Sequence, residues 1–147
     1  MFAEATPPIA RKSRIRLYLE MVRFSHTIFA MPFAILAVIW CVAVGFRESG
    51  WATSAISIWR WLGILLCMVT ARNFAMTVNR LADSKFDVSN PRTAGRHLPS
   101  GQISVRAAVI FAAANALIFV AACGLFLPNR IPLLLCFPVL AFLAGYS

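Results

Sequence analysis

Three side chains with oxygen donors, Asn79, Asp83 and Asp87, recur at intervals of four residues along the chain. A step of four residues turns about 40° around a helix axis, so the three lie on one narrow face. Arg72 falls on the same face, and the resulting stripe extends over about 22 Å of helix. Two carboxylates one turn apart repel each other, and the arrangement becomes favourable when a cation lies beside them. Hard oxygen donors without His or Cys favour Mg²⁺ or Ca²⁺ over zinc.

Mg²⁺ usually takes one or two carboxylates from a protein and completes its shell with water and substrate phosphate groups. The stripe therefore predicts a Mg²⁺–diphosphate site in which Asn79, Asp83 and Asp87 hold the metal and the two aspartates act in catalysis. The neighbouring basic residues supply charge for the anion; they are Arg72, Arg80, Lys85, Arg92 and Arg96. The alternative is that Asp83 and Asp87 only pair with Arg80 and Lys85 on a solvated helix end. The polar residues deeper on the same stripe favour the site.

The composition indicates an integral membrane protein made of helices. Of the 147 residues, 61% are hydrophobic and 13% are charged, against about 25% charged residues in a typical soluble domain. We therefore expect an all-α, multi-pass transmembrane helix bundle that lies in a lipid bilayer. The net charge of +9 does not indicate a nucleic-acid partner, because the basic residues flank apolar segments, where they meet lipid headgroups.

Four membrane spans are expected, at about 24–46, 61–82, 105–127 and 131–147, after a basic segment over residues 1–22 that ends in a short surface helix. The first uncharged run has 23 residues, too many for the apolar region of a signal peptide, which has about 7–15. The second is uncharged only over 61–71, too short to cross the hydrocarbon core. It must continue through Arg72 and Asn79, whose polar groups then face protein or water. Residues 88–101 are predicted to form a loop, and Ser104 to cap the next helix.

The distribution of Lys and Arg predicts the orientation. Ten basic residues flank the spans on the side of the N-terminus and the 83–104 segment, and three lie on the other side. Because cytoplasmic flanks carry the excess of positive charge, the N-terminus and this segment are expected in the cytoplasm, with the chain in the inner (plasma) membrane. The carboxylate stripe then opens towards the cytoplasm.

The stripe and the segment after it resemble a known family. The sequence Asn79-x-x-x-Asp83-x-x-x-Asp87 is followed by Asn-Pro-Arg-Thr-Ala-Gly-Arg over 90–96 and by Leu-Pro-x-Gly-x-Ile-Ser over 98–104. This closely resembles the first aspartate-rich motif and the following loop of UbiA-type polyprenyltransferases. The segments Arg-Phe-Ser-His-Thr at 23–27 and Ala-Gly-Tyr-Ser at 144–147 also look like that family's first and fourth helices.

The resemblance implies a membrane enzyme of about nine helices, of which this chain would hold about four as a partial domain over 23–147. Such enzymes join the polyprenyl group of a polyprenyl diphosphate to an aromatic acceptor. Asn79, Asp83 and Asp87 would hold Mg²⁺ and the diphosphate, and Arg23 and Arg72 would contact the diphosphate or the acceptor. The likeness is greatest to the type that acts on 4-hydroxybenzoate in quinone biosynthesis.

The chain departs from the family in one respect. The family has a second aspartate-rich motif in its C-terminal half, whereas the acidic residues here are Glu4, Glu20, Glu48, Asp83 and Asp87. We therefore expect the 147-residue chain to be inactive alone and to lack a C-terminal half.

Two other functions are considered. A membrane transporter or adaptor with an intramembrane Arg–Asp relay would show an ion-dependent flux that prenyl diphosphates leave unchanged. A CDP-alcohol phosphatidyltransferase also uses D-x-x-x-D with Mg²⁺, but its motif begins with an aspartate upstream, and no aspartate precedes Asp83.

Overall fold

The computed structural model describes residues 13–23, positions 28, 31–32, 35–36, 38–40 and 43, and residues 58–146. All regular structure in this part of the chain is helical, and no strand occurs there. The elements are α1 (Arg14–Met21), α3 (Ile58–Ser89), α4 (Val105–Cys123), the 3₁₀ helix η2 (Gly124–Phe126) and α5 (Ile131–Gly145). Most of the expected first span over 24–46, residues 1–12 of the basic segment, and Ser147 lie outside the described residues.

The helix expected for the second span continues through its polar residues, because α3 is one helix of 32 residues that includes Arg72 and Asn79. At about 1.5 Å per residue it is about 48 Å long, well beyond the hydrocarbon core of about 30 Å. Both α3 and the stretch Val105–Phe126 are long and apolar enough to cross a membrane, whereas α5 has only 15 residues. Length and composition thus support two of the four expected spans.

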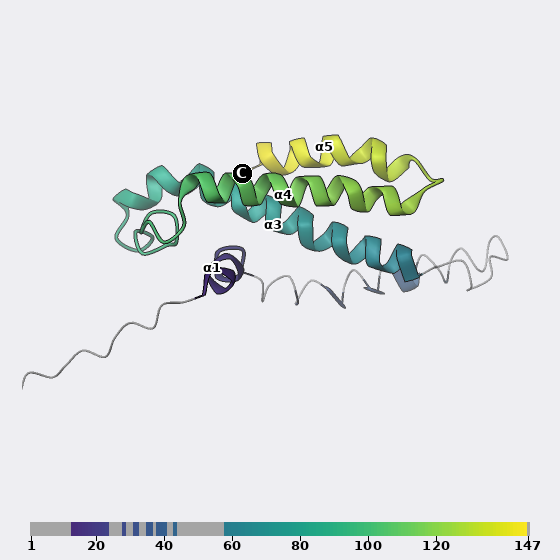
Figure 1. Cartoon of the computed structure of the whole chain (residues 1–147), viewed down its shortest axis with the longest axis horizontal. Helices are drawn as coiled ribbons and strands as arrows, with labels where there is room; N and C mark the ends of the chain where they lie inside the picture. Colours follow the sequence, from purple (N-terminus) through teal and green to yellow (C-terminus); the bar gives the residue numbers. More distant parts are fainter. Residues whose placement is uncertain are drawn as a thin grey trace, which may run out of the picture.

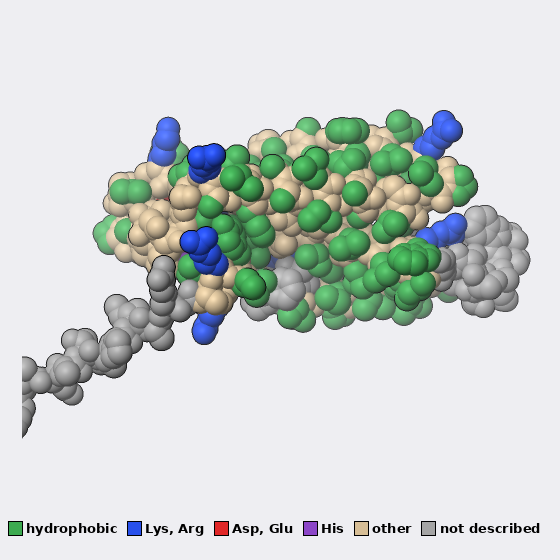
Figure 2. All heavy atoms as spheres, viewed as in Figure 1, with side chains coloured by type: hydrophobic (Ala, Val, Ile, Leu, Met, Phe, Trp, Pro, Cys, Tyr) green, Lys and Arg blue, Asp and Glu red, His purple; other side chains and the backbone are tan. Residues whose placement is uncertain are grey.

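Helices α3, α4 and α5 lie side by side, and α1 lies next to the end of the bundle where α3 is joined to α4 (Figure 1). Residues 90–104 form this connection, which we call the 90–104 loop. On the face shown in Figure 2, Lys and Arg side chains lie at the two ends of the bundle, and hydrophobic side chains cover the length between them. This distribution is the one expected for helices whose middle part lies in lipid.

Local side-chain hydrogen bonds determine where the helices begin. Ser104 has an extended backbone, and its side chain accepts a hydrogen bond from the backbone N–H of Ala107 at 3.2 Å, which confirms the predicted cap of α4. Gly101, just before it, has a φ of +72°, a left-handed conformation that suits glycine. At the other end of the bundle, Asn129 Oδ1 accepts from the backbone N–H of Ile131 at 3.0 Å, and Pro132 follows in the first turn of α5.

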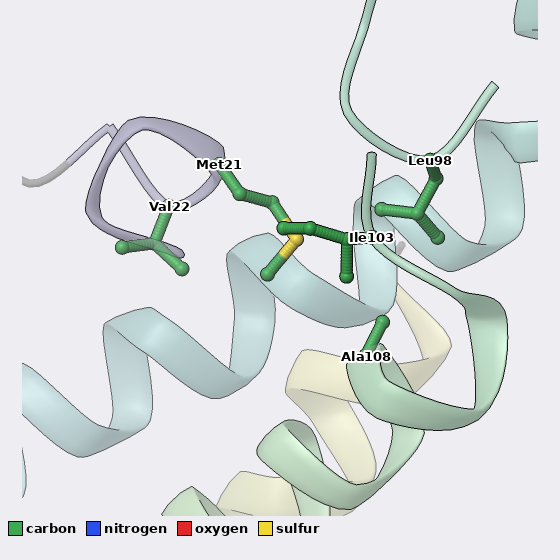
Figure 3. Packing of buried hydrophobic residues seen from close by; sticks show 5 residues of the cluster. All are labelled: Met21, Val22, Leu98, Ile103 and Ala108. Atoms are coloured by element: carbon green, nitrogen blue, oxygen red, sulfur yellow. The ribbon is translucent and has the colours of Figure 1, made fainter. Parts of the chain in front are cut away.

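Two apolar clusters hold the elements together. The first joins α1 to the 90–104 loop and the start of α4 through Met21, Val22, Leu98, Ile103 and Ala108 (Figure 3). The second joins α4 to α5 near the opposite end through Phe119, Cys123 and Cys136. The first cluster fixes α1 beside the polar end of α3, where the candidate site lies.

Candidate functional site

A cavity of about 700 Å³ lies between the end of α1, the last turns of α3 and the 90–104 loop. Its lining carries four arginines and two carboxylates, together with one histidine: Arg23, Arg80, Arg92, Arg96, Glu20, Asp87 and His97. Guanidinium groups bind phosphate and carboxylate through paired N–H donors. The excess of arginine over carboxylate therefore makes this cavity suitable for an anion.

Asp87 and Arg96 form the central ion pair of the cavity. Arg96 Nη1 lies 2.8 Å from both Oδ1 and Oδ2 of Asp87, whose side chain is only 9% exposed. Asp87 is five residues beyond the expected end of the span at residue 82, so it lies about 7.5 Å past that end. The hydrogen bonds from Arg96 hold the pKa of the Asp87 carboxyl below its usual value, although partial burial acts in the opposite direction.

The loop makes this ion pair possible through its own hydrogen bonds. Asn90 begins a turn in which its side chain accepts from the backbone N–H of Arg92 at 3.0 Å and its carbonyl accepts from Thr93 and Ala94 at 2.9 Å each. The Thr93 hydroxyl donates to the backbone carbonyl of Asp87 at 3.2 Å. The turn thus folds the loop back over the end of α3 and directs Arg96 to Asp87.

The structure brings together three of the predicted site residues, Arg23, Asp87 and Arg96, in the cavity lining. Asn79 and Asp83 are half-buried on α3 and do not line the cavity, and Lys85 is exposed outside it. The steady drift of about 40° per four residues turns the earlier members of the stripe away from the direction of Asp87.

Arg72 lies nearer the middle of α3, 15 residues before Asp87 and so about 22 Å from it along the helix. Its side chain is half-buried, and its Nε is buried without a hydrogen-bond partner among the described residues. A buried guanidinium nitrogen without a hydrogen-bond acceptor is energetically costly in a membrane helix. Arg72 is therefore suited to bind an anionic ligand.

The described residues hold no group of three or more His, Cys, Asp and Glu side chains placed to bind a metal ion. The predicted ligand set contains two carboxylates and one amide on successive turns of α3, which suits Mg²⁺ because this ion takes its remaining ligands from water and phosphate. Asp87 holds Arg96 on both oxygens, but an ionised carboxylate has about four acceptor positions and retains capacity for a cation. The donor chemistry therefore fits Mg²⁺.

Two polar contacts were not anticipated from the sequence. His97 Nε2 lies 3.3 Å from Glu20 Oε2 across 77 positions of the chain, and no local spacing marks this pair. Asn73 Nδ2 donates to Asn115 Oδ1 at 3.2 Å and links α3 to α4. The second contact could have been predicted in part from Asn115, since an asparagine within an apolar helix usually forms a hydrogen bond with a neighbouring helix.

The model of the UbiA prenyltransferase family matches residues 37–147. The chain belongs to this family. The match covers α3, α4, α5 and the 90–104 loop, and it confirms the resemblance seen in the aspartate stripe and the loop.

Curated UbiA relatives support the assignment. The 4-hydroxybenzoate octaprenyltransferase of Acidovorax ebreus (strain TPSY) is 32% identical over 69% of this chain and 33% of its own length. That of Paracidovorax citrulli (strain AAC00-1) is 34% identical over 76% of this chain and 35% of its own. The protoheme IX farnesyltransferase of Bartonella quintana (strain Toulouse) is 32% identical over 67% of this chain and 32% of its own length. The match thus spans about a third of the length of these relatives. No solved structure matches this chain significantly.

Proposed function

We propose that this chain supplies a diphosphate-binding site for the Mg²⁺-dependent transfer of a polyprenyl group from a polyprenyl diphosphate to an aromatic acceptor such as 4-hydroxybenzoate, a step of quinone biosynthesis. The observation that carries the proposal is the arginine-lined cavity around Asp87 at the end of α3. Family membership favours prenyl transfer over transport and over phosphatidyl transfer. The reaction takes place at the cytoplasmic face of the plasma membrane, where the basic end of the bundle lies.

The arginines of the cavity act on the diphosphate. Arg23, Arg80, Arg92 and Arg96 surround the same space, so they orient the anion and stabilise the charge that grows on it as the allylic C–O bond breaks. The electron pair of that bond leaves with the diphosphate, a ring carbon of the acceptor attacks the prenyl cation, and the ring then loses its proton. Lys85, exposed on α3 outside the cavity, adds positive charge to this end of the helix. Arg72, whose Nε has no hydrogen-bond partner among the described residues, binds diphosphate or the acid group of the acceptor.

Asn79, Asp83 and Asp87 would hold Mg²⁺, which when bound stabilises negative charge on the leaving diphosphate. Asp87 keeps its contact with Arg96 at the same time, because the carboxylate has acceptor positions to spare. Arg96 thereby holds the aspartate that faces the anion, and the 90–104 loop links the metal ligands on α3 to the arginines of the cavity.

The choice of acceptor is the narrower part of the proposal. Two of the relatives named above are 4-hydroxybenzoate octaprenyltransferases and one is a protoheme IX farnesyltransferase. By their names, all three enzymes transfer a prenyl group, and they differ in the acceptor that receives it. An aromatic acid is favoured here because Arg72 offers a cation inside the bundle for its carboxylate.

Binding of pyrophosphate tests the site directly. The chain in lipid nanodiscs is titrated with inorganic pyrophosphate in the presence and absence of Mg²⁺, and heat is measured by calorimetry. We expect Mg²⁺-dependent binding that Asp83→Asn and Asp87→Asn each weaken by at least about tenfold. Arg96→Gln should weaken it as well, whereas Arg130→Gln, at the opposite end of the bundle, should not. Equal binding by the wild type and both aspartate variants would contradict the proposal.

A further inference from the structure

Glu20 lies in the wall of an anion site although it carries a negative charge itself. It lines the same cavity as four arginines, and its side chain is 31% exposed. Its two oxygens have different partners: Oε1 accepts from Arg16 Nε at 2.9 Å, and Oε2 lies 3.3 Å from His97 Nε2. Because an ionised carboxylate only accepts hydrogen bonds, His97 is the donor in the second contact.

The Glu20–His97 contact connects the two walls of the cavity. His97 follows Arg96, which binds Asp87 at the end of α3. Glu20 lies near the end of α1, three residues before Arg23, which also lines the cavity. One hydrogen bond between α1 and the 90–104 loop therefore fixes the distance between two arginines that come from distant parts of the sequence.

The surrounding packing supports a positioning role. Met21 and Val22, directly after Glu20, are buried in one cluster with Leu98, the residue after His97, and Ile103, and the side chain of Met21 extends towards Ile103 (Figure 3). Arg23 then has a φ of +49°, in the left-handed region that a residue with a Cβ adopts only at an energetic cost. Such a conformation persists where the surrounding structure holds it, and here the docked end of α1 does so.

We infer that Glu20 and His97 are positioning residues of the diphosphate site: their hydrogen bond holds α1 on the 90–104 loop so that Arg23 and Arg96 face the same anion. The inference rests on the proposed function, since it assigns these residues to the diphosphate site proposed above. For the removal of Glu20, it predicts a change in pyrophosphate affinity opposite to the one that simple electrostatics predicts. Removal of a negative charge from an anion site should strengthen pyrophosphate binding, whereas loss of a positioning contact should weaken it.

Four variants and a double variant separate these effects by titration with Mg²⁺ and pyrophosphate in nanodiscs. Glu20→Ala and His97→Ala should each weaken binding by about three- to tenfold, and the double variant should weaken it no further, because both remove the same contact. Glu20→Gln keeps an acceptor and His97→Gln keeps a donor, so both should bind nearly as the wild type does. Arg14→Gln is the matched control on α1, because Arg14 is exposed and does not line this cavity.

A second pair of variants applies where an alanine variant fails to fold by circular dichroism. Glu20→His and His97→Glu should each weaken binding, and the two together should restore it by re-forming the contact in reverse. Unchanged or tighter binding by Glu20→Ala and His97→Ala, or additive losses in the double variant, would overturn the inference while the proposed function stands. Absence of pyrophosphate binding by the wild type would overturn both.

Discussion

The two oxygens of Asp87 share one guanidinium nitrogen, Arg96 Nη1, at 2.8 Å each. The spacing of the stripe predicts Asp87 as a site residue, and it offers Arg80 and Lys85 as the alternative partners because these lie on the same helix. The actual partner comes from the 90–104 loop, nine residues away. Sequence periodicity predicts which side chains share a helix face, and it contains no information about how a loop folds back on that face.

This ion pair predicts a dependence of stability on pH. Because Arg96 lowers the pKa of Asp87 in the folded chain, the carboxyl stays ionised to a lower pH there than in the unfolded chain. The stabilisation is therefore present above the unfolded pKa of about 4, and it is lost as the pH falls through the folded value. We expect Asp87→Asn to lower the unfolding temperature in detergent at pH 7 and to have a smaller effect at pH 3, below the unfolded pKa.

Arg96→Gln provides the control for this prediction, since it removes the other half of the same pair. Its destabilisation should diminish over the same pH range, as measured by circular dichroism during heating. An unfolding temperature that differs between the wild type and Asp87→Asn by the same amount at both pH values would show that the ion pair is not the source of the effect.

At the scale of elements, the helices were predictable and their mutual packing was not. The uncharged runs located α3 and α4, and the need to cross the hydrocarbon core extended α3 through Arg72 and Asn79. The docking of α1 depends on a cluster that Met21 and Val22 share with Leu98 and Ile103, which are 76 to 82 residues away in the chain. Such contacts follow from three-dimensional packing, and the sequence pattern of either segment alone does not indicate them.

Close packing between α3 and η2 gives a prediction at this scale. A Cβ at Gly63 would lie 3.0 Å from Phe126 Cζ and 3.4 Å from Leu125 Cβ, so no larger side chain fits without movement. Membrane helices use small residues to approach each other in this way. We expect Gly63→Leu to destabilise the bundle by about 1–3 kcal/mol, the usual cost of overpacking.

Gly124→Leu is the matched control, because a Cβ at Gly124 meets nothing within 4 Å. Both variants are unfolded by SDS in mixed micelles, and the free energy of unfolding is compared with that of the wild type. Equal stability of Gly63→Leu and the wild type would mean that the contact between α3 and η2 is looser than the structure shows.

At the scale of the whole molecule, the distribution of charge gives the bundle a polar end and predicts its orientation in the membrane. The proposed function needs the cavity and the 90–104 loop on the cytoplasmic side, and the count of ten basic residues against three predicts this orientation. The structure adds that the arginines of the loop do more than flank a span, because four arginines converge on one cavity. The same positive charges thus serve orientation and anion binding.

Accessibility of single cysteines tests the orientation. Gly95 in the 90–104 loop and Asn129 in the connection between α4 and α5 are both exposed and lie at opposite ends of the bundle. Each is replaced by cysteine in a chain whose four native cysteines are changed to alanine, and spheroplasts are treated with a membrane-impermeant maleimide. Asn129→Cys should react in intact spheroplasts, and Gly95→Cys only after lysis. The reverse pattern would place the arginine cavity outside the cell, away from cytoplasmic Mg²⁺ and prenyl diphosphates, and the proposed function would then fail on topology even if the isolated chain binds pyrophosphate.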